Sequence, residues 1–519
     1  MDKDLHSIQE ARDLIAKAKA AQQEFKHFSQ DQVDKIVLAM VNAGANAAEK
    51  LAKMAVEESQ IGKYEDKITK NLFATKSLWE SIKSLKTVGV IGTEANGKII
   101  KIAEPMGVIA TLIPCTNPTS TAMFKAIISV KTRNAIVASP HPRSIKCTAE
   151  ALEILNKAAI QAGAPEGLIN CMLTPTLEGT EQLMKHKDVA LILATGGSNM
   201  VKAAYSSGKP AYGVGPGNVP AFIERSANVQ KAVADIIYGK TFDNGTLCSS
   251  EQAIIADKPI VDEIKKEVIK NGGYFLNSEE KLKLEKFAVP HGHLNSEIVG
   301  KSAQWIAKQA GINIPENVKA LVVETKSVGR EEPLSIEKLS PILAFYVVDG
   351  WLEGCHKCIE LLNLGGIGHT MAIHSSDKDI IMKFAFEKPA FRIIVNTTSA
   401  LGAVGYTTAL NPSLTLGPGT WGGSVISENV SAKHLMNIKH LAFETNPVNQ
   451  GFAVDHIANS SEMRESFLEE IEKRLLARAG NPKVQSYQSF QKNEKTTETS
   501  KSISEEEIDK IIMSFFNKK

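Results

Sequence analysis

The chain has 519 residues, 43% apolar and 23% charged, a balance typical of a soluble globular protein with more than one domain. Its 60 Lys and Arg against 58 Asp and Glu leave a formal charge of +2, which gives no electrostatic reason to expect binding to nucleic acid or to a membrane surface. No apolar run approaches the roughly 18 residues of a membrane span. Residues 1–20 contain no signal-peptide core, so the sequence predicts a cytoplasmic protein.

The first eighty residues are predicted to be helical, because apolar residues recur at helical spacing from Ile8 to Ala18 and from Val33 to Val56. Short β-rich runs begin after residue 85. Residues 99–102 follow Asn96-Gly97, a hairpin-turn dipeptide, so residues 92–104 predict a protruding hairpin. Such a hairpin is either an arm for subunit contacts or an ordinary surface loop, and the sequence leaves both open.

Strands and helices then alternate, which predicts parallel sheets covered by helices. The predicted strands are 108–113, 136–138, 171–173, 190–194 and 252–256, and the predicted helices are 120–129, 145–162, 229–239 and 261–270. The expected fold is α/β, with two Rossmann-like open-sheet lobes and a cleft between them. Ligands of such sheets bind at the carboxyl ends of the strands.

The predicted organisation has six parts. They are a first lobe (1–91 and 105–225), a second lobe (226–416), an arm with its return segment (92–104 and 417–450), a C-terminal helical extension (451–485), a disordered linker (486–502) and a terminal helix (503–519). The linker has almost nothing to bury. The terminal helix begins with a capping box and carries Ile508, Ile511, Ile512 and Phe515 on one face, which predicts a tethered amphipathic helix.

Six cysteines in a chain of this length do not make a disulfide scaffold. Cys355 and Cys358 form one CxxC pair, but no second pair follows at zinc spacing. We interpret the pair as helix residues and expect no metal. Cys248 lies instead on a Gly-containing loop between a predicted helix and a predicted strand, where a thiol is either an exposed nucleophile or a small buried apolar residue.

Two other segments stand where α/β proteins build their sites. Asn117 follows a predicted strand, and its amide either donates to a developing oxyanion or caps the next helix. Cys115, in the same Pro-rich segment, is a less suitable thiol. Thr195, Gly196 and Gly197 join a strand to a helix, and glycine there lets the backbone approach a pyrophosphate at the helix N-terminus.

Together these segments resemble the aldehyde dehydrogenase superfamily, and more closely its CoA-acylating branch, over about residues 10–450. The motifs that carry the resemblance are 113–121 (IPCTNPTST), 139–143 (SPHPR), 194–197 (ATGG), 215–220 (GPGNVP), 242–248 (FDNGTLC), 337–341 (EKLSP) and 365–370 (GGIGHT). Their order and spacing make the resemblance specific, although each motif alone is a weak signal.

The resemblance implies a role for each matching residue. Cys248 is the expected nucleophile, Asn117 binds the oxyanion together with the Cys248 backbone N–H, and His369 either assists deprotonation of a thiol or has a packing role. The expected cofactor-binding residues are Thr195, Gly196, Gly197, Ser139, Pro140, Gly215 and Glu337, with Glu337 on the nicotinamide ribose.

Two departures from the hydrolytic members follow from the same resemblance. Val214 stands at the position of the glutamate that activates water in those members, and Ser139 replaces their lysine near the adenosine ribose. The expected reaction is therefore reversible NAD-dependent oxidation of a short aldehyde, acetaldehyde or propionaldehyde, with coenzyme A releasing the acyl group from Cys248. The alternatives are a hydrolytic dehydrogenase that gives a carboxylate, or a catalytically idle nucleotide-binding assembly protein.

The expected partners are the aldehyde, coenzyme A and further copies of the chain, in a dimer or tetramer. Similar C-terminal tails direct enzymes of this kind into bacterial microcompartment shells. Residues 503–519 therefore predict a shell-binding helix and a location inside a microcompartment, or else a helix that packs on its own subunit.

Overall fold

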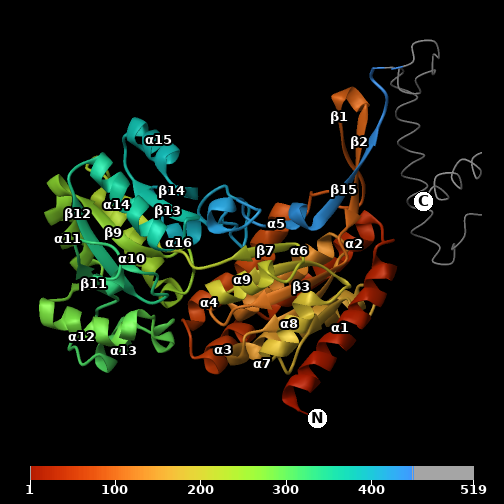
Figure 1. Cartoon of the computed structure of the whole chain (residues 1–519), viewed down its shortest axis with the longest axis horizontal. Helices are drawn as coiled ribbons and strands as arrows, with labels where there is room; N and C mark the ends of the chain where they lie inside the picture. The colour runs from red at the N-terminus through yellow and green to blue at the C-terminus, as the bar shows by residue number, and fades with distance from the viewer. Residues whose placement is uncertain (1, 447, 449–519) are drawn as a thin grey trace, which may run out of the picture. The chain divides into compact units, whose positions relative to one another are not determined.

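A computed structural model describes residues 2–446 and 448, which belong to one compact unit. They form two parallel β-sheets and one antiparallel sheet, arranged as two α/β lobes and an arm (Figure 1). The predicted C-terminal extension, linker and terminal helix lie outside the described residues. No helix of the described part is long and apolar enough to cross a membrane.

The first lobe contains a five-stranded parallel sheet of order β5-β4-β3-β6-β7. Its strands are β3 (Val108–Ile113), β4 (Ala135–Pro140), β5 (Ile169–Cys171), β6 (Val189–Thr195) and β7 (Ala211–Val214). Every residue of β3 and β4 is buried, as expected for strands covered on both faces. The predicted strands and parallel sheet are confirmed, with end shifts of one or two residues.

The helices of this lobe also follow the predicted pattern. They are α1 (Lys3–Phe25), α2 (Gln30–Asn46), α3 (Ala48–Ser59), α4 (Tyr64–Leu72), α5 (Leu78–Ile82), α6 (Pro118–Lys131), α7 (Ile145–Gln161), α8 (Leu177–Lys185) and α9 (Ser198–Tyr205). Helix α6 is buried along its whole length. Strands β3 and β6 are neighbours from which the chain continues in opposite directions across the sheet, so a crevice opens at their carboxyl ends.

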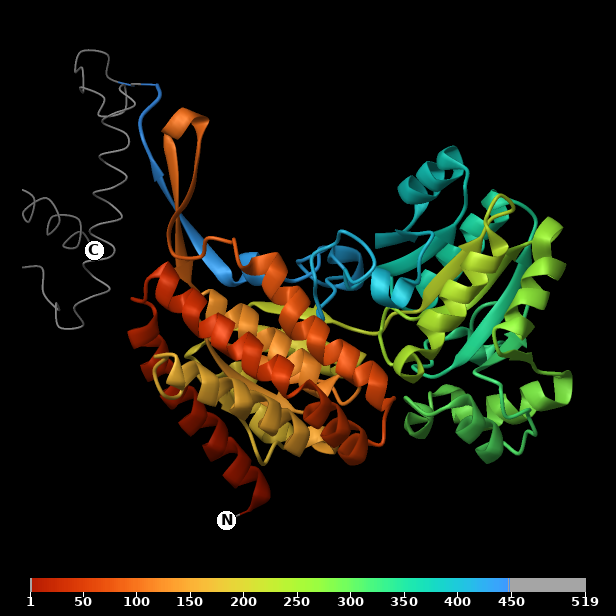
Figure 2. The ribbon, with the colours of Figure 1, turned by 180° about the vertical axis from the view of Figure 1, so that it is seen from behind.

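The second lobe contains a seven-stranded parallel sheet of order β10-β11-β12-β9-β8-β13-β14. Its strands are β8 (Val219–Ile223), β9 (Glu251–Asp257), β10 (Gly273–Phe275), β11 (Ala320–Glu324), β12 (Ile342–Val348), β13 (Gly368–His374) and β14 (Ala390–Val395). Its helices are α10 (Val229–Thr241), α11 (Val261–Lys270), α12 (Ser278–Ala288), α13 (Ala303–Gln309), α14 (Trp351–Leu364), α15 (Lys378–Glu387) and α16 (Ser399–Gly402). Figure 2 shows both lobes from the opposite side.

One domain boundary needs correction. The sequence places the division after residue 225, which assigns β8 to the first lobe, but β8 pairs with β9 and β13 of the second sheet. The division therefore falls between β7 and β8. The error arises because β7 and β8 are both short apolar runs in a Gly- and Pro-rich stretch, and their sequences carry no sign of which sheet each joins.

The arm is a three-stranded antiparallel sheet of order β1-β2-β15, with β1 (Gly89–Glu94), β2 (Ile99–Pro105) and β15 (Met436–Ala442). The hairpin turn uses left-handed backbone at Ala95, Asn96 and Gly97. The arm begins at Gly89 rather than at residue 92, and its return strand lies within the predicted 417–450. The side chain of Asn134 joins the two ends of the arm, since it accepts from the Gly107 N–H and donates to the Leu435 carbonyl.

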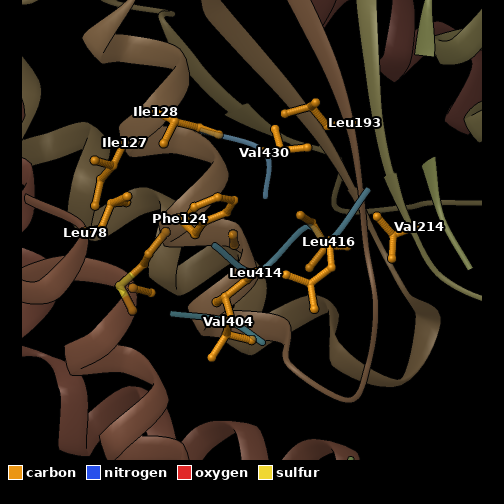
Figure 3. Packing of buried hydrophobic residues seen from close by; sticks show 14 of the residues in the cluster. Leu78, Phe124, Ile127, Ile128, Leu193, Val214, Val404, Leu414, Leu416 and Val430 are labelled. Carbon is orange, nitrogen blue, oxygen red and sulfur yellow. The ribbon is translucent and has the colours of Figure 1, made fainter. Parts of the chain in front are cut away.

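The segment from Val404 to Val430 returns along the first lobe and adds to its core (Figure 3). Val404, Leu414 and Leu416 belong to the same apolar cluster as Phe124 of α6 and Leu193 of β6.

Cys355 and Cys358 are buried in α14, and the Lys388 ammonium hydrogen-bonds the Cys355 thiol. In the part of the chain that the structure describes, no three His, Cys, Asp or Glu side chains gather as metal ligands.

Candidate active site

A cavity of about 460 Å³ lies at the carboxyl ends of β3, β4 and β6, opposite the loop that precedes β9. Residues from both lobes line it. All the site residues that the sequence selects are among them except His369, and these are Asn117, Ser139, Pro140, Thr195, Gly196, Gly197, Gly215, Cys248 and Glu337. The two lobes therefore contribute opposite walls of one cavity.

Cys248 is presented by a tight loop between α10 and β9. Asp243, Asn244 and Gly245 have φ angles of +46°, +55° and +73°, which turns the chain sharply before the thiol. A Cβ on Gly245 would lie 2.9 Å from the Lys240 carbonyl oxygen, so the loop has room only for glycine at that point. The thiol itself is half-buried in the cavity wall.

The surroundings of Cys248 hold its thiol protonated in the resting site. Burial, and secondly the Glu337 carboxylate, raise the pKa of Cys248 to about 12. The Arg392 guanidinium and the backbone N–H groups of Cys248 and Ser249 act in the opposite direction and favour the thiolate. Cys115 also lines the cavity, and burial raises its pKa too, although Arg143 and Lys67 oppose the shift.

Asn117 stands between β3 and α6, as predicted. It occupies the N-cap position of α6, but its side chain makes no capping hydrogen bond. Its Oδ1 accepts a hydrogen bond from the Lys70 ammonium, and its Nδ2 donates to the Thr116 hydroxyl over 3.2 Å. The amide is therefore not used as a cap, and Asn117 lines the cavity that contains Cys248.

The first-lobe wall is open enough for a dinucleotide. A Cβ added to Gly197 or Gly215 would meet no atom within 4 Å, and the hydroxyl of Thr195 is buried without a hydrogen-bond partner. Helix α9 starts after Gly197 with no side-chain cap, so its first N–H groups are available to an anion. The Ser139 hydroxyl lies 2.8 Å from the Thr180 hydroxyl. These groups suit a bound pyrophosphate and ribose.

Glu337 is the one carboxylate among the described residues that line the cavity. Its Oε1 accepts a 2.8 Å hydrogen bond from the Gly217 N–H, and burial raises its pKa to about 7. Val214, which the sequence resemblance leads us to expect at the position of the hydrolytic glutamate, also lines the cavity and is apolar. The wall facing Cys248 thus has no carboxylate at that position.

His369 is not brought into the cavity lining. It is buried in β13, its Nδ1 lies 2.9 Å from the Thr370 hydroxyl, and its Nε2 has no partner. A Cβ on Gly217 would lie 3.1 Å from the His369 Nδ1 and 2.3 Å from the Cys248 carbonyl oxygen, so His369 packs behind the cavity wall. Burial and Arg392 lower its pKa to about 3, which makes it a weak proton acceptor. The packing role is therefore favoured over the catalytic one.

Sequence reasoning missed the charged groups behind the site. Lys67 and Lys70 of α4 are buried and both hydrogen-bond Asp243 of the Cys248 loop. Arg392 of β14 donates to the Thr370 hydroxyl and to the Gly417 carbonyl. Lysines three apart share one helix face, which could have drawn attention to Lys67 and Lys70, but nothing in the sequence pairs them with a residue more than 170 positions away.

Comparison with known proteins agrees with this geometry. The sequence model of the aldehyde dehydrogenase family matches residues 5–272. The bifunctional aldehyde-alcohol dehydrogenase AdhE of Escherichia coli K12 is 45% identical over 441 residues, 84% of this chain but only 50% of AdhE. The chain thus spans about half the length of the first curated relatives it matches.

Solved structures match over nearly their whole length. An acetylating aldehyde dehydrogenase from Geobacillus thermoglucosidasius has a TM-score of 0.85 and 52% identity, over 87% of this chain and 100% of that one. Two propionaldehyde dehydrogenases each have a TM-score of 0.76 and 30% identity over 83% of this chain and 97% of theirs. One comes from a Clostridium phytofermentans microcompartment, and the other, from Rhodopseudomonas palustris, holds CoA and an acylated cysteine.

Proposed function

The chain belongs to the aldehyde dehydrogenase family, and from this premise we propose that it oxidises a short aldehyde to an acyl-CoA, with NAD as hydride acceptor. One observation carries the proposal: Cys248, Asn117 and Val214 line the same cavity. We match Val214 to the glutamate of the hydrolytic members, and a valine supplies no base there. Acetaldehyde and propionaldehyde are the substrates we favour, because relatives named for acetylation and for propionaldehyde match this fold.

The residues of the first-lobe wall would hold NAD. The Thr195 hydroxyl, the backbone of Gly196 and Gly197 and the α9 N-terminus suit its phosphates, Ser139 and Pro140 border the adenosine side, and Glu337 faces the ribose of the nicotinamide. Bound there, NAD supplies a hydride acceptor. Gly215 leaves space for its approach.

Cys248 would then act as nucleophile. The thiol releases its proton to solvent as its sulfur bonds to the aldehyde carbon, and the resulting oxyanion accepts hydrogen bonds from the Asn117 amide and the Cys248 N–H. Loss of hydride from that carbon leaves a thioester on Cys248. The coenzyme A thiol adds to the thioester carbonyl and the Cys248 thiolate leaves, so aldehyde, NAD⁺ and CoA become acyl-CoA, NADH and a proton. Val214 offers no base to activate water, so thiol attack is faster than hydrolysis.

An NADH assay with acetaldehyde, with and without coenzyme A, tests this proposal. We expect sustained NADH formation only when CoA is present, with acyl-CoA as product. Equal rates without CoA, with free acid as product, would establish the hydrolytic alternative. No NADH under either condition would favour a catalytically idle assembly protein.

We also propose that the arm mediates assembly into a dimer or tetramer, and that residues 503–519 bind a microcompartment shell protein. The exposed residues of β15 support the first proposal, as does the edge of that strand, which pairs with no other strand among residues 2–446. The capped amphipathic pattern of the tail and the microcompartment relative support the second. On this proposal the enzyme is cytoplasmic and works inside a microcompartment.

A further inference from the structure

Two lysines of α4 form a buried bridge between the loops that present Asn117 and Cys248. Lys67 and Lys70 are 2% and 4% exposed, and a buried ammonium needs an anion and hydrogen-bond acceptors. Both meet the same atom: Lys67 Nζ lies 3.1 Å from Asp243 Oδ2, and Lys70 Nζ hydrogen-bonds that oxygen as well. Asp243 is fully buried on the Cys248 loop.

Asp243 is in turn fixed from several sides. It accepts from the Thr246 hydroxyl over 2.7 Å and from the Lys63 N–H over 2.6 Å, while its own N–H donates to Asp66 over 2.7 Å. A Cβ on Gly62 would lie 2.0 Å from Asp243 Oδ1, so the backbone just before α4 packs directly against this carboxylate. The Cys248 loop is therefore anchored to α4.

Each lysine also donates to the loop that presents Asn117, and Lys70 Nζ in addition donates to the Thr246 hydroxyl of the Cys248 loop over 3.3 Å. Lys67 Nζ donates to the Thr116 carbonyl over 3.0 Å, whereas Lys70 Nζ donates to the Asn117 side-chain oxygen. An ammonium can only donate, so the atom of Asn117 that faces Lys70 is Oδ1 and the amide NH₂ points elsewhere. Rotation of the amide would set NH₂ against NH₃⁺. A cation on the amide oxygen also polarises the amide and makes its N–H groups better donors.

We propose that Lys70 is the positioning residue of the oxyanion site: it fixes the orientation of the Asn117 amide and, through Asp243, its placement relative to Cys248. This inference rests on the proposed function, since it assigns Lys70 to the step in which Asn117 stabilises the oxyanion. Lys70 itself is absent from the cavity lining, so it is assigned an action through Asn117 rather than on the substrate.

Lys67 provides a control, because it is also buried, lies on the same helix and meets the same Asp243 oxygen, but it contacts the Thr116 backbone where Lys70 contacts the Asn117 amide and the Thr246 hydroxyl. We expect Lys70→Met to lower kcat about 10²-fold, close to the loss from Asn117→Ala. The fold-loss of kcat in Lys67→Met should be at least about tenfold smaller than the fold-loss in Lys70→Met, although both variants remove a buried lysine. KM for NAD should stay within about twofold in both variants, because neither lysine lines the cavity.

Two further measurements separate positioning from general damage. The double variant Lys70→Met/Asn117→Ala should be no slower than Asn117→Ala alone, because the two residues act as one unit. Alkylation of Cys248 by iodoacetamide, which forms no oxyanion, should proceed at the wild-type rate. Melting temperatures, with the buried Lys131→Met as a reference outside the site, establish folding. If Lys70→Met does not fold, Lys70→Gln is compared in the same way.

Equal kcat losses in Lys67→Met and Lys70→Met, or multiplicative losses in the double variant, would overturn the inference while leaving the proposed function intact. Absence of CoA-dependent NADH formation by the wild-type enzyme would overturn both. A selective kcat loss in Lys70→Met with normal alkylation supports the inference.

Discussion

The two walls of the cavity are built by the same rule but carry different chemistry. Both come from the carboxyl ends of parallel strands. The described lining of the first-lobe wall is mostly glycine, proline, small hydroxyl and apolar residues, together with Cys115, Asn117 and His141, and it includes no carboxylate or ammonium group. The second-lobe wall carries the Cys248 thiol and the Glu337 carboxylate. The first wall is suited to hold a cofactor through backbone and hydroxyl groups and to support the oxyanion through Asn117, and the second wall supplies the nucleophile.

The buried charged side chains behind the two walls can also be compared by their pKa values. Lys125 of the first lobe donates to the carbonyls of Leu112 and Leu193, and burial holds its pKa well below the usual value. Behind the second wall, burial brings the pKa values of Lys240 and Glu251, like that of Glu337, to about 7. On the first-lobe side, burial also lowers the pKa of Lys70 to about 8, so buried groups that titrate near neutrality lie behind both walls.

The largest expected effect is at Cys248. Cys248→Ala should lower NADH formation by at least about 10⁴-fold, because the bond-forming atom is lost, while NAD binding to the opposite wall persists. Cys115→Ala, on the first-lobe wall, is the control and should remain active. Loss of activity in Cys115→Ala together with an active Cys248→Ala would show that Cys115, on the first-lobe wall, is the nucleophile.

Gly217 packs closely against the Cys248 backbone and the His369 ring. Gly217→Ala would place a methyl group 2.3 Å from the Cys248 carbonyl oxygen, so the Cys248 loop must shift. We expect about 1–3 kcal/mol of lost stability, visible as a lower melting temperature, and a fall in kcat of about 10²-fold. A variant with wild-type melting temperature and activity would show that the loop tolerates displacement.

Gly197→Ala tests the ligand-holding wall alone. The added methyl group meets no protein atom within 4 Å, so the melting temperature should not fall. It would enter the space assigned to the cofactor, and KM for NAD should rise about tenfold with little change in kcat. An unchanged KM would mean that the cofactor phosphates lie elsewhere along this wall.

Glu337→Gln tests the electrostatics of the reactive wall. The ionised carboxylate disfavours the Cys248 thiolate and raises its pKa, so removing the charge should lower that pKa. The difference should appear above pH 7, where Glu337 is ionised, and vanish below it, because its pKa is about 7. The pH dependence of Cys248 alkylation measures it; slower alkylation of the variant above pH 7 would contradict the sign.

Removal of residues 503–519 should have the smallest effect on catalysis. The proposed reaction assigns no role to these residues, so kcat and KM should be unchanged, while the enzyme no longer sediments with a shell fraction. Loss of solubility or of activity in the truncated chain would instead favour a tail that packs on its own subunit.

The regular elements and the cavity walls could be predicted because their signals are local. Helix α11 spans the predicted residues 261–270, and the loops that present Asn117, Gly197 and Cys248 follow or precede predicted strands. The site residues were selected by resemblance to a family, and several of them also lie next to the ends of predicted strands.

What the sequence could not supply depends on distant pairing. The assignment of β8 to the second sheet, the bridge from Lys70 to Asp243 and the place of His369 behind Gly217 each join residues far apart in the chain. The periodicity of each segment is the same whichever partner it meets. His369 also illustrates a limit of motifs, since a histidine in a glycine-rich turn is compatible with exposure or with burial.

The arm has a consequence for biosynthesis. Strands β1 and β2 are neighbours in the chain, but the third strand, β15, begins at Met436 and pairs residue by residue with β2 from Met436–Pro105 to Ala442–Ile99. A growing polypeptide emerges from the ribosome N-terminus first, so one edge of the hairpin stays unpaired until both lobes have been synthesised. The arm can therefore be completed only after the whole catalytic region has been translated. Any interaction that requires the three-stranded sheet excludes prematurely terminated chains.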